Sequence, residues 1–522
     1  MEEFALCPNP HFVVIPWPVT SHMIPMVDIA CLLAAHGAPV TIITPPSCSQ
    51  LVHSRVDRAR AGQAAGSAGI GITVTALPFP CAEAGLPAGC ERLDHVPSVD
   101  LVPNFFDANA QFGDAVADHC RLLMATPTPT RRPSCIVAGM CNTWAHGVAR
   151  ELGVPCFIFH GFGAFALLCC EYLNTHKPHE GKSLDEAIDV PVLPPPLELK
   201  FARRQLPLQF LPSCSIPESR LRELREFEMA VDGIVVNSFE ELEHDSAARL
   251  AAATGKTVLA VGPVSLCGGG GGGGARAPPS LLDVRAATDS SVNDDARRCM
   301  AWLDAKKAES SSSSVLYVSF GSAGRMPPEQ LMELGLALVS CSWPVLWVIK
   351  GADTLPDDVD EWLQHNTGGD DGQCLAVRGW APQVAILEHP AVGGFLTHCG
   401  WGSTLESVTA GVPMATWPFS AEQFLNEKVI VGVLGIGVSV GVTKPTEGVL
   451  TGAKDGGGGG ARAKADVGME QVKRALDMLM DGGVDGEARR TKARELKAKA
   501  KSALEHGGSS YMNLEKMIQF AA

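Results

Sequence analysis

The sequence lacks most features that would place a protein in a membrane or outside the cell. Its longest apolar stretch, residues 429–442, is too short and too rich in glycine to cross a bilayer. The opening residues lack the basic segment of a secretory signal. The 17 cysteines form no CxxC pair, which is typical of reduced thiols and not of a disulfide framework. We therefore expect a cytoplasmic protein without a membrane span.

The chain also lacks an excess of positive charge. Its formal net charge at pH 7 is −15, from 42 Lys and Arg against 57 Asp and Glu. A nucleic-acid-binding protein needs a basic surface to displace phosphate counterions, so we expect no nucleic-acid partner. An anionic ligand would have to be held by local groups, such as the amino termini of helices.

Short β-rich runs alternate with longer helical patterns along most of the 522 residues. The chain opens with an apolar run at residues 12–15, a loop, a helical pattern that ends at Gly37 and a second apolar run at 39–45. The alternation resumes with similar runs at 315–322 and 392–398. This pattern predicts an α/β fold with parallel sheets covered by helices on both faces. The length is that of two domains.

A change of composition separates the two halves. Seven consecutive glycines occupy residues 268–274, and a serine run occupies 310–314. Such segments are typical of linkers and surface extensions. The predicted parts are an N-terminal domain over residues 1–261, a linker with low-complexity extensions over 262–314, a C-terminal domain over 315–490 and a C-terminal helical tail over 491–522.

Two strand-to-helix loops carry reactive residues where doubly wound sheets bind ligands, at the carboxyl ends of strands. The first contains His22, and the second is HCGWGSTLE at residues 398–406. In the second loop, small residues allow a ligand to approach, and a helix beginning near Ser403 would direct its free amides toward a diphosphate. A glycine-rich turn of this kind is also often only a tight turn. No cluster has the ligand spacing of a zinc site, so we expect no metal.

Residues 380–423, WAPQVAILEHPAVGGFLTHCGWGSTLESVTAGVPMATWPFSAEQ, resemble the signature box of the plant family 1 UDP-glycosyltransferases. The segments HFVVIPWPVTSHMIPMVDIA, NSFEELE (237–243) and VLYVSFGS (315–322) resemble the same family. The resemblance implies two facing Rossmann-like doubly wound domains of GT-B type, with the acceptor bound mainly by the first domain and the UDP-sugar by the second. It implies a plant enzyme of secondary metabolism that moves a hexose, glucose, from UDP-glucose to a hydroxyl of a small lipophilic acceptor. UDP-glucose would be the co-substrate, and no cofactor is implied.

The resemblance also implies a donor site in the second half of the chain. Its residues are Trp380, Ala381 and Gln383 at the base and ribose, Glu406 at the ribose hydroxyls, Ser322, His398 and Ser403 at the diphosphate, Glu422 and Gln423 at the sugar, and Trp401 and Gly402 within the same loop. Trp380 would stack on uracil. His398 would donate to the diphosphate in place of a metal and stabilise the departing UDP. A Gln at the end of the box, here Gln423, is associated with glucose.

His22 is the general base that the resemblance implies. It would deprotonate the acceptor hydroxyl, which attacks the anomeric carbon in a single inverting displacement as UDP leaves. A nearby helix amino terminus disfavours the imidazolium form and keeps the ring able to take up a proton near neutral pH. The first-domain loops 81–112 and 184–211 would shape the acceptor pocket.

Three residues depart from the family pattern. Gly139 stands where the family has an Asp that orients the histidine, Gly402 stands where it has an Asn, and Ser21 replaces a Gly. Loss of the equivalent Asp in a serine protease lowers the rate by about 10⁴-fold. A second interpretation is therefore a catalytically weak or inactive relative that binds UDP-sugar or a lipophilic ligand.

Overall fold

The structure is a computed structural model, and the chain divides by its contacts into two compact units. The first unit contains residues 1–171, 215–276 and 500–522, and the second contains residues 172–214 and 277–499. The structure describes residues 9–61, 71–128, 131–193, 199–214, 216–267, 290–310, 314–321, 324–351, 355–367, 372–446 and 465–522, with the side chains of 290–293 excepted.

A seven-stranded parallel sheet forms the centre of the first unit, in the order β3-β2-β1-β4-β5-β8-β9. The strands are β1 (His11–Ile15), β2 (Val40–Thr44), β3 (Ile72–Ala76), β4 (Pro133–Gly139), β5 (Cys156–His160), β8 (Gly233–Val236) and β9 (Thr257–Ala260). Every residue of β1, β2, β5 and β8 is buried. Continuous burial of this kind is expected for parallel strands covered on both faces.

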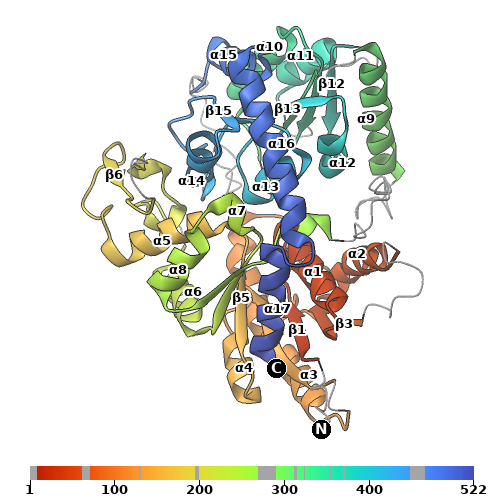
Figure 1. Ribbon diagram of the computed structural model, residues 1–522, viewed down its shortest axis with the longest axis vertical. Helices are drawn as coiled ribbons and strands as arrows, with labels where there is room; N and C mark the ends of the chain where they lie inside the picture. The colour runs from red at the N-terminus through yellow and green to blue at the C-terminus, as the bar shows by residue number, and fades with distance from the viewer. Residues whose placement is uncertain are drawn as a thin grey trace. The chain divides into compact units, whose positions relative to one another are not determined.

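Helices connect the strands of the first unit (Figure 1). They are α1 (Thr20–Ala35), α2 (Ser49–Ala61), α3 (Val102–Met124), α4 (Ala145–Leu152), α5 (Ala164–His176), α6 (Glu218–Ala230), α7 (Glu240–Glu243), α8 (Ser246–Thr254) and α17 (Ser509–Ala521). The division between the units falls within α5. The last helix, α17, packs against β9 and α1.

The second unit repeats the same plan with six parallel strands in the order β12-β11-β10-β13-β14-β15. They are β10 (Val315–Ser319), β11 (Val345–Ile349), β12 (Cys374–Arg378), β13 (Val392–Thr397), β14 (Met414–Thr416) and β15 (Gly437–Ser439). The short strands β6 (Ala187–Asp189) and β7 (Lys200–Ala202) pair antiparallel. The helices are α9 (Ser290–Glu309), α10 (Pro328–Val339), α11 (Asp357–Thr367), α12 (Gln383–Glu388), α13 (Trp401–Ala410), α14 (Gln423–Lys428), α15 (Met469–Met480) and α16 (Val484–Leu504).

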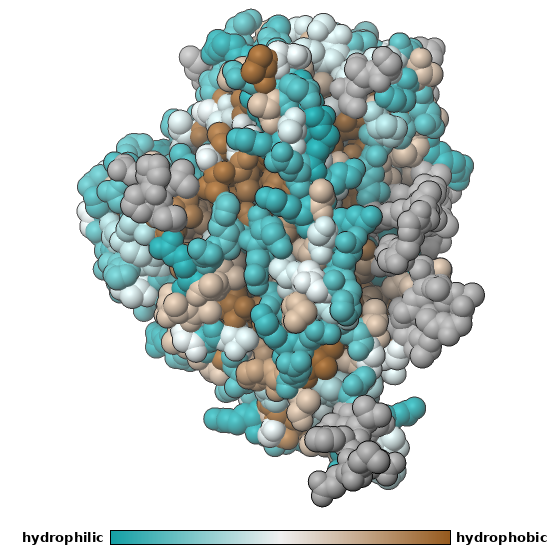
Figure 2. All heavy atoms as spheres, in the orientation of Figure 1, coloured by the Kyte–Doolittle hydropathy of each residue, from teal (hydrophilic) through white to brown (hydrophobic). Residues whose placement is uncertain are grey.

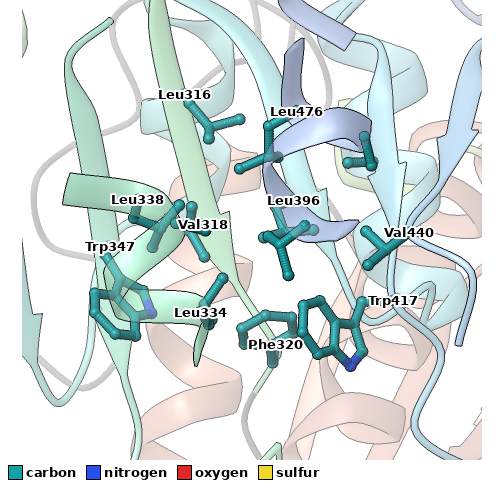
Figure 3. Close-up of a cluster of buried hydrophobic side chains, with 14 of the residues drawn as sticks. Leu316, Val318, Phe320, Leu334, Leu338, Trp347, Leu396, Trp417, Val440 and Leu476 are labelled. Carbon is teal, nitrogen blue, oxygen red and sulfur yellow. The ribbon is translucent and has the colours of Figure 1, made fainter. Parts of the chain in front are cut away.

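One face of the second sheet packs on α10 and α15 through a continuous apolar core (Figure 3). Leu316 and Val318 lie two residues apart on β10 and therefore point to the same face. They meet side chains from both helices and the neighbouring strands, including Leu334, Leu338, Trp347, Leu396 and Leu476. Burial of each such side chain contributes about 1.5–3 kcal/mol. This core fixes the ends of β10 and β13, which lead into the predicted donor residues.

The α/β class with two Rossmann-like sheets is confirmed, and several segments group differently from the predicted boundaries. Residues 172–214 of the predicted N-terminal domain group with the second unit. Residues 500–522 of the predicted tail group with the first unit, because Phe520 packs on Phe157 with ring centroids 5.2 Å apart and Asn513 Nδ2 donates to the Ala260 carbonyl at 3.0 Å. Residues 290–309 of the predicted linker form α9. The glycine run at 268–274 lies outside the described residues.

No described helix is both long and apolar enough to cross a membrane. The exposed large apolar side chains, which include Leu122, Met229 and Val484, come from scattered positions in the sequence. Along α16 the face drawn in Figure 2 is mainly hydrophilic, which agrees with the many Lys, Arg and Glu residues of that helix.

Candidate active site

The two sheets share one topological feature, a switch point between their first and fourth strands in chain order. In the first unit β1 lies between β2 and β4, and in the second β10 lies between β11 and β13. Doubly wound sheets bind ligands at this point, beyond the carboxyl ends of the strands. His22 follows β1 and His398 follows β13. His22, the predicted base, and His398, predicted to bind the diphosphate, thus lie at the switch points of separate sheets.

His22 lies in the first turn of α1, because this helix begins at Thr20 and not after the histidine. Its ring is T-shaped to Trp17, with centroids 5.5 Å apart, and lies 6.4 Å from the ring of Phe159. A side-chain carbon at Gly161 would lie 2.7 Å from His22 Cε1, so only glycine leaves room for the ring. The Nδ1 atom of His22 is buried and has no hydrogen-bond partner among the described residues.

The surroundings of His22 hold its imidazole neutral. Burial, and secondarily the charge of nearby His160, lower the pKa of His22 to about 4. Burial also lowers the pKa of His160 to about 4, although His160 Nε2 lies 3.8 Å from Glu228 Oε1. The sequence argument gave the helix amino terminus as the cause, whereas burial is the larger one here. A neutral ring can accept a proton, but a base with so low a pKa accepts it weakly.

Gly139 is the last residue of β4, and the backbone of Trp17 crosses directly beside it. A side-chain carbon at Gly139 would lie 2.7 Å from Trp17 N and 2.9 Å from Trp17 Cβ. The turn after β4 is held by Asn142, whose Nδ2 donates to the Ile15 carbonyl at 2.9 Å. Asn109 Nδ2 donates to Asn142 Oδ1 at 3.2 Å. The space in which an Asp side chain would begin is therefore occupied by Trp17, in the segment that follows β1.

A buried carboxylate that sequence reasoning left without a role fixes the start of α5. Glu243 Oε2 and Oε1 accept hydrogen bonds from the backbone amides of Ala164 at 2.9 Å and Phe165 at 2.8 Å. These are amides of the first helical turn, which have no partner inside the helix. Glu243 thereby holds the loop that presents Gly161 to His22. Glu243 is the final residue of the NSFEELE segment, and this motif was the feature of the sequence that could have identified it.

In the second unit, Gln383 contacts two other predicted donor-binding residues, Ser403 and Glu406. Its Nε2 donates to Glu406 Oε2 at 2.7 Å and to Ser403 Oγ at 2.9 Å, and its Oε1 accepts from the Tyr317 hydroxyl at 3.2 Å. Ser403 and Glu406 are three residues apart on α13 and share one face of it. Gln383 begins α12, so the contact joins the amino-terminal parts of two helices.

The ring of His398 is enclosed by two glycines. A side-chain carbon at Gly321 would lie 2.7 Å from His398 Cε1, and one at Gly400 would contact Nε2. Gly321 also has a φ of +76°, which favours glycine. Burial lowers the pKa of His398 to about 4, so the neutral ring can donate one N–H. Ser322, which would follow Gly321, lies outside the described residues.

The loop between β13 and α13 is held by Asn426, which sequence reasoning missed. Asn426 Nδ2 donates to the Cys399 carbonyl at 2.9 Å, and Cys399 has a φ of +64°. The helix starts at Trp401, two residues before the predicted Ser403. Trp401 is only 3 % exposed, whereas Gly402 is exposed and a side-chain carbon there would meet no atom within 4 Å.

Glu422 and Gln423 lie at the start of α14. Burial raises the pKa of Glu422 to about 7, and Asn426 Nδ2 donates to its Oε1 at 3.4 Å. Gln423 Oε1 accepts from the backbone amides of Phe419 at 2.8 Å and Ser420 at 3.0 Å. These two bonds orient the amide so that its Nε2 is the group left to bind a ligand hydroxyl.

Trp380 and Ala381 lie in the loop between β12 and α12. Trp380 is half-buried and Ala381 is buried. The loop thus leaves part of an aromatic surface exposed at the carboxyl end of β12, as stacking on a base requires. No group of three or more His, Cys, Asp or Glu within the described ranges could hold a metal ion, and a metal-free site stays a prediction.

Two doubly wound units with polar side chains gathered at their switch points are the architecture of a GT-B glycosyltransferase. The model of the UDP-glucoronosyl and UDP-glucosyl transferase family matches residues 290–454. The chain is 38% identical to UDP-glycosyltransferase 73D1 of Arabidopsis thaliana and 38% identical to UDP-glycosyltransferase 73E1 of Stevia rebaudiana. Each comparison covers 98% of this chain and 96% of the relative. The chain belongs to the plant family 1 UDP-glycosyltransferases.

Solved structures of this family share the fold. UGT73P12 of Glycyrrhiza uralensis, complexed with glycyrrhetinic acid 3-O-monoglucuronide, is similar with a TM-score of 0.79 and 30% identity, covering 98% of this chain and 95% of that one. A UDP-glucosyltransferase of Polygonum tinctorium that can glucosylate indoxyl is similar with a TM-score of 0.68 and 27% identity, covering 99% of each chain. The GT-B fold is thereby confirmed.

Proposed function

We propose that this UDP-glycosyltransferase moves glucose from UDP-glucose to a hydroxyl of a small lipophilic acceptor in the cytoplasm, without a metal. The observation that carries the proposal is the contact of Gln383 with Ser403 and Glu406 at 2.9 and 2.7 Å. This contact joins three of the residues that the resemblance assigns to the base, the ribose and the diphosphate. Such a cluster suits a nucleotide sugar better than a purely structural role, because its carboxylate can accept from two ribose hydroxyls.

In the proposed reaction, each donor residue acts on one part of UDP-glucose. Trp380 stacks on the uracil, and Glu406 accepts hydrogen bonds from the ribose. The amino terminus of α13 and the neutral ring of His398 donate to the diphosphate, where negative charge grows as the bond to the anomeric carbon breaks. Gln423 Nε2 donates to a sugar hydroxyl.

His22 is the proposed general base of an inverting displacement. The acceptor hydroxyl gives its proton to His22, its oxygen forms a bond to the anomeric carbon, and UDP leaves with the electron pair of the broken bond. The neutral state of the ring supports this role, because a protonated imidazole could not accept the proton.

A second candidate function is a binding relative with little or no transferase activity. The observation that favours it is the buried Nδ1 of His22, which has no hydrogen-bond partner among the described residues, in a chain with a glycine at position 139. Without a carboxylate, the imidazolium formed during proton transfer is not stabilised. This candidate keeps the donor site and loses the transfer step.

Calorimetric titration with UDP and UDP-glucose, followed by an assay of UDP release with an acceptor mixture, tests both candidates. Glu406→Gln is expected to weaken UDP-glucose binding about 10- to 100-fold, because hydrogen bonds to a charged group are lost. Glu361→Gln, at an exposed position of α11, is the matched control and should bind as the parent does. Binding without release supports the second candidate, and absence of UDP binding contradicts both.

A further inference from the structure

The acid that would orient His22 is absent from β4, and no carboxylate among the described residues accepts a hydrogen bond from Nδ1 of its ring. Trp17 fills the space beside Gly139, and the buried Nδ1 of His22 has no hydrogen-bond partner in any described range. The titratable neighbour coupled to His22 is a second histidine, His160. The immediate environment of His22 therefore disfavours the protonated imidazole, whereas a neighbouring aspartate would stabilise it.

The acids near this site bind other groups. Asp94 Oδ2 accepts from Thr20 Oγ1 at 2.7 Å at the start of α1 and is paired with Arg92. Glu228 Oε1 lies 3.8 Å from His160 Nε2. The first turn of α1, which includes His22, contains no acidic residue of its own. Arg92 contacts Thr20 at the same helix start and balances the charge of Asp94, so the positive end of the helix dipole is retained.

From this arrangement, and resting on the proposed transferase function, we propose that the acceptors of this enzyme are oxyanions: aromatic carboxylic acids and acidic phenols, which lose their proton to solvent before the reaction. A nucleophile that arrives ionised needs no general base. The amino terminus of α1 favours a bound anion. Aliphatic alcohols, which keep their proton until attack, would depend on His22 and react poorly.

The step balances without proton transfer to the protein. A carboxylate or phenolate oxygen supplies the electron pair of the new bond to the anomeric carbon. The bond between that carbon and the β-phosphate oxygen breaks, and UDP leaves with its electrons. A carboxylate gives an acyl glucoside, and a phenolate gives an aryl glucoside. His22 then packs against the acceptor as a neutral ring.

A series of one-ring acceptors of similar size tests the proposal on the unmodified full chain with UDP-glucose. Benzoate, p-nitrophenol, p-cyanophenol, phenol and benzyl alcohol have falling acidity, and kcat/KM is measured for each at one neutral pH. We expect kcat/KM to fall along the series by about 100-fold or more, the size of a general-base contribution. Cleavage of the product by hydroxylamine distinguishes an acyl glucoside from an aryl glucoside.

The His22→Gln variant provides a second readout on the same series. It should lower kcat/KM for phenol by about 100-fold more than it lowers kcat/KM for benzoate. Benzyl alcohol reacting as fast as p-nitrophenol in the unmodified chain overturns this proposal and leaves the transferase function standing. Absence of transfer to every acceptor, with UDP-glucose bound, overturns the transferase function itself.

Discussion

A side-chain carbon at Gly139 would lie 2.7 Å from the backbone nitrogen of Trp17. A flexible side chain could move away, whereas this neighbour is backbone, two residues beyond the end of β1. The strands β1 and β4 are paired, with Ile15 opposite Ala138, so the two strand ends cannot separate without disturbing the centre of the sheet. A side chain at position 139 therefore requires the chain around Trp17 to move, and we expect that the single substitution Gly139→Asp is not accommodated without such a shift.

Gly139→Ala is expected to destabilise the protein by about 1–3 kcal/mol, the usual cost of overpacking. Gly147→Ala is the matched control, because Gly147 is exposed in α4 and a side-chain carbon there meets no atom within 4 Å. This control should stabilise the helix by about 0.5–1 kcal/mol. Denaturant unfolding of both variants measures the two values, and equal stability of the two would contradict the geometry at Gly139.

Gly402→Asn is expected to tighten UDP-sugar binding. The position is exposed in the first turn of α13, and a side chain there enters open space. One added hydrogen bond is worth about 0.5–1.5 kcal/mol, which corresponds to about 2- to 10-fold in affinity. Calorimetric titration with UDP-glucose measures the change. Unchanged affinity for UDP and for UDP-glucose would show that this residue contacts neither.

Glu243→Gln should lower the free energy of unfolding by about 1–3 kcal/mol, because two amides of α5 lose a charged acceptor. Glu226→Gln changes an exposed glutamate of α6 and should stay within about 0.5 kcal/mol of the parent. Urea unfolding compares the two. If the Glu243→Gln variant is as stable as the Glu226→Gln control, Glu243 does not hold the start of α5 in place.

The stability of the first unit should depend on pH through His160. Burial lowers its pKa from 6.5 to about 4, so in this interval the unfolded chain binds more protons than the folded one. The contribution is present above pH 6.5 and is lost as pH falls toward 4. The difference in unfolding free energy between the parent and His160→Phe should therefore shrink as pH falls. Repeating both measurements with Glu228→Gln removes the titration of the facing acid, and a difference that stays constant would argue against a buried neutral His160.

The alternation of strands and helices was predictable because a parallel strand covered on both faces consists of consecutive apolar residues. The runs at 315–322 and 392–398 correspond to β10 and β13, whose last residues are Ser319 and Thr397. The switch points and the positions of His22 and His398 follow from this order.

The contacts around His22 were not predictable from the sequence. Gly139, Gly161 and Glu243 approach the start of α1 or α5 only because β1, β4 and β5 are neighbours in the sheet. These residues are far in sequence from the residues that they contact. In addition, a glycine in a sequence does not indicate which side chain occupies the space beside it. Asn426 was missed because its hydrogen bond to Cys399 spans 27 residues outside any local pattern.

The most direct test of the central claim is a mass-spectrometric assay of the unmodified chain with UDP-glucose and a panel of small aromatic acceptors. The account predicts that UDP and a hexosylated acceptor form in equal amounts, with transfer to acidic acceptors fastest. Tight binding of UDP-glucose with no hexosylated product from any acceptor would contradict it and leave a UDP-sugar-binding relative of the family.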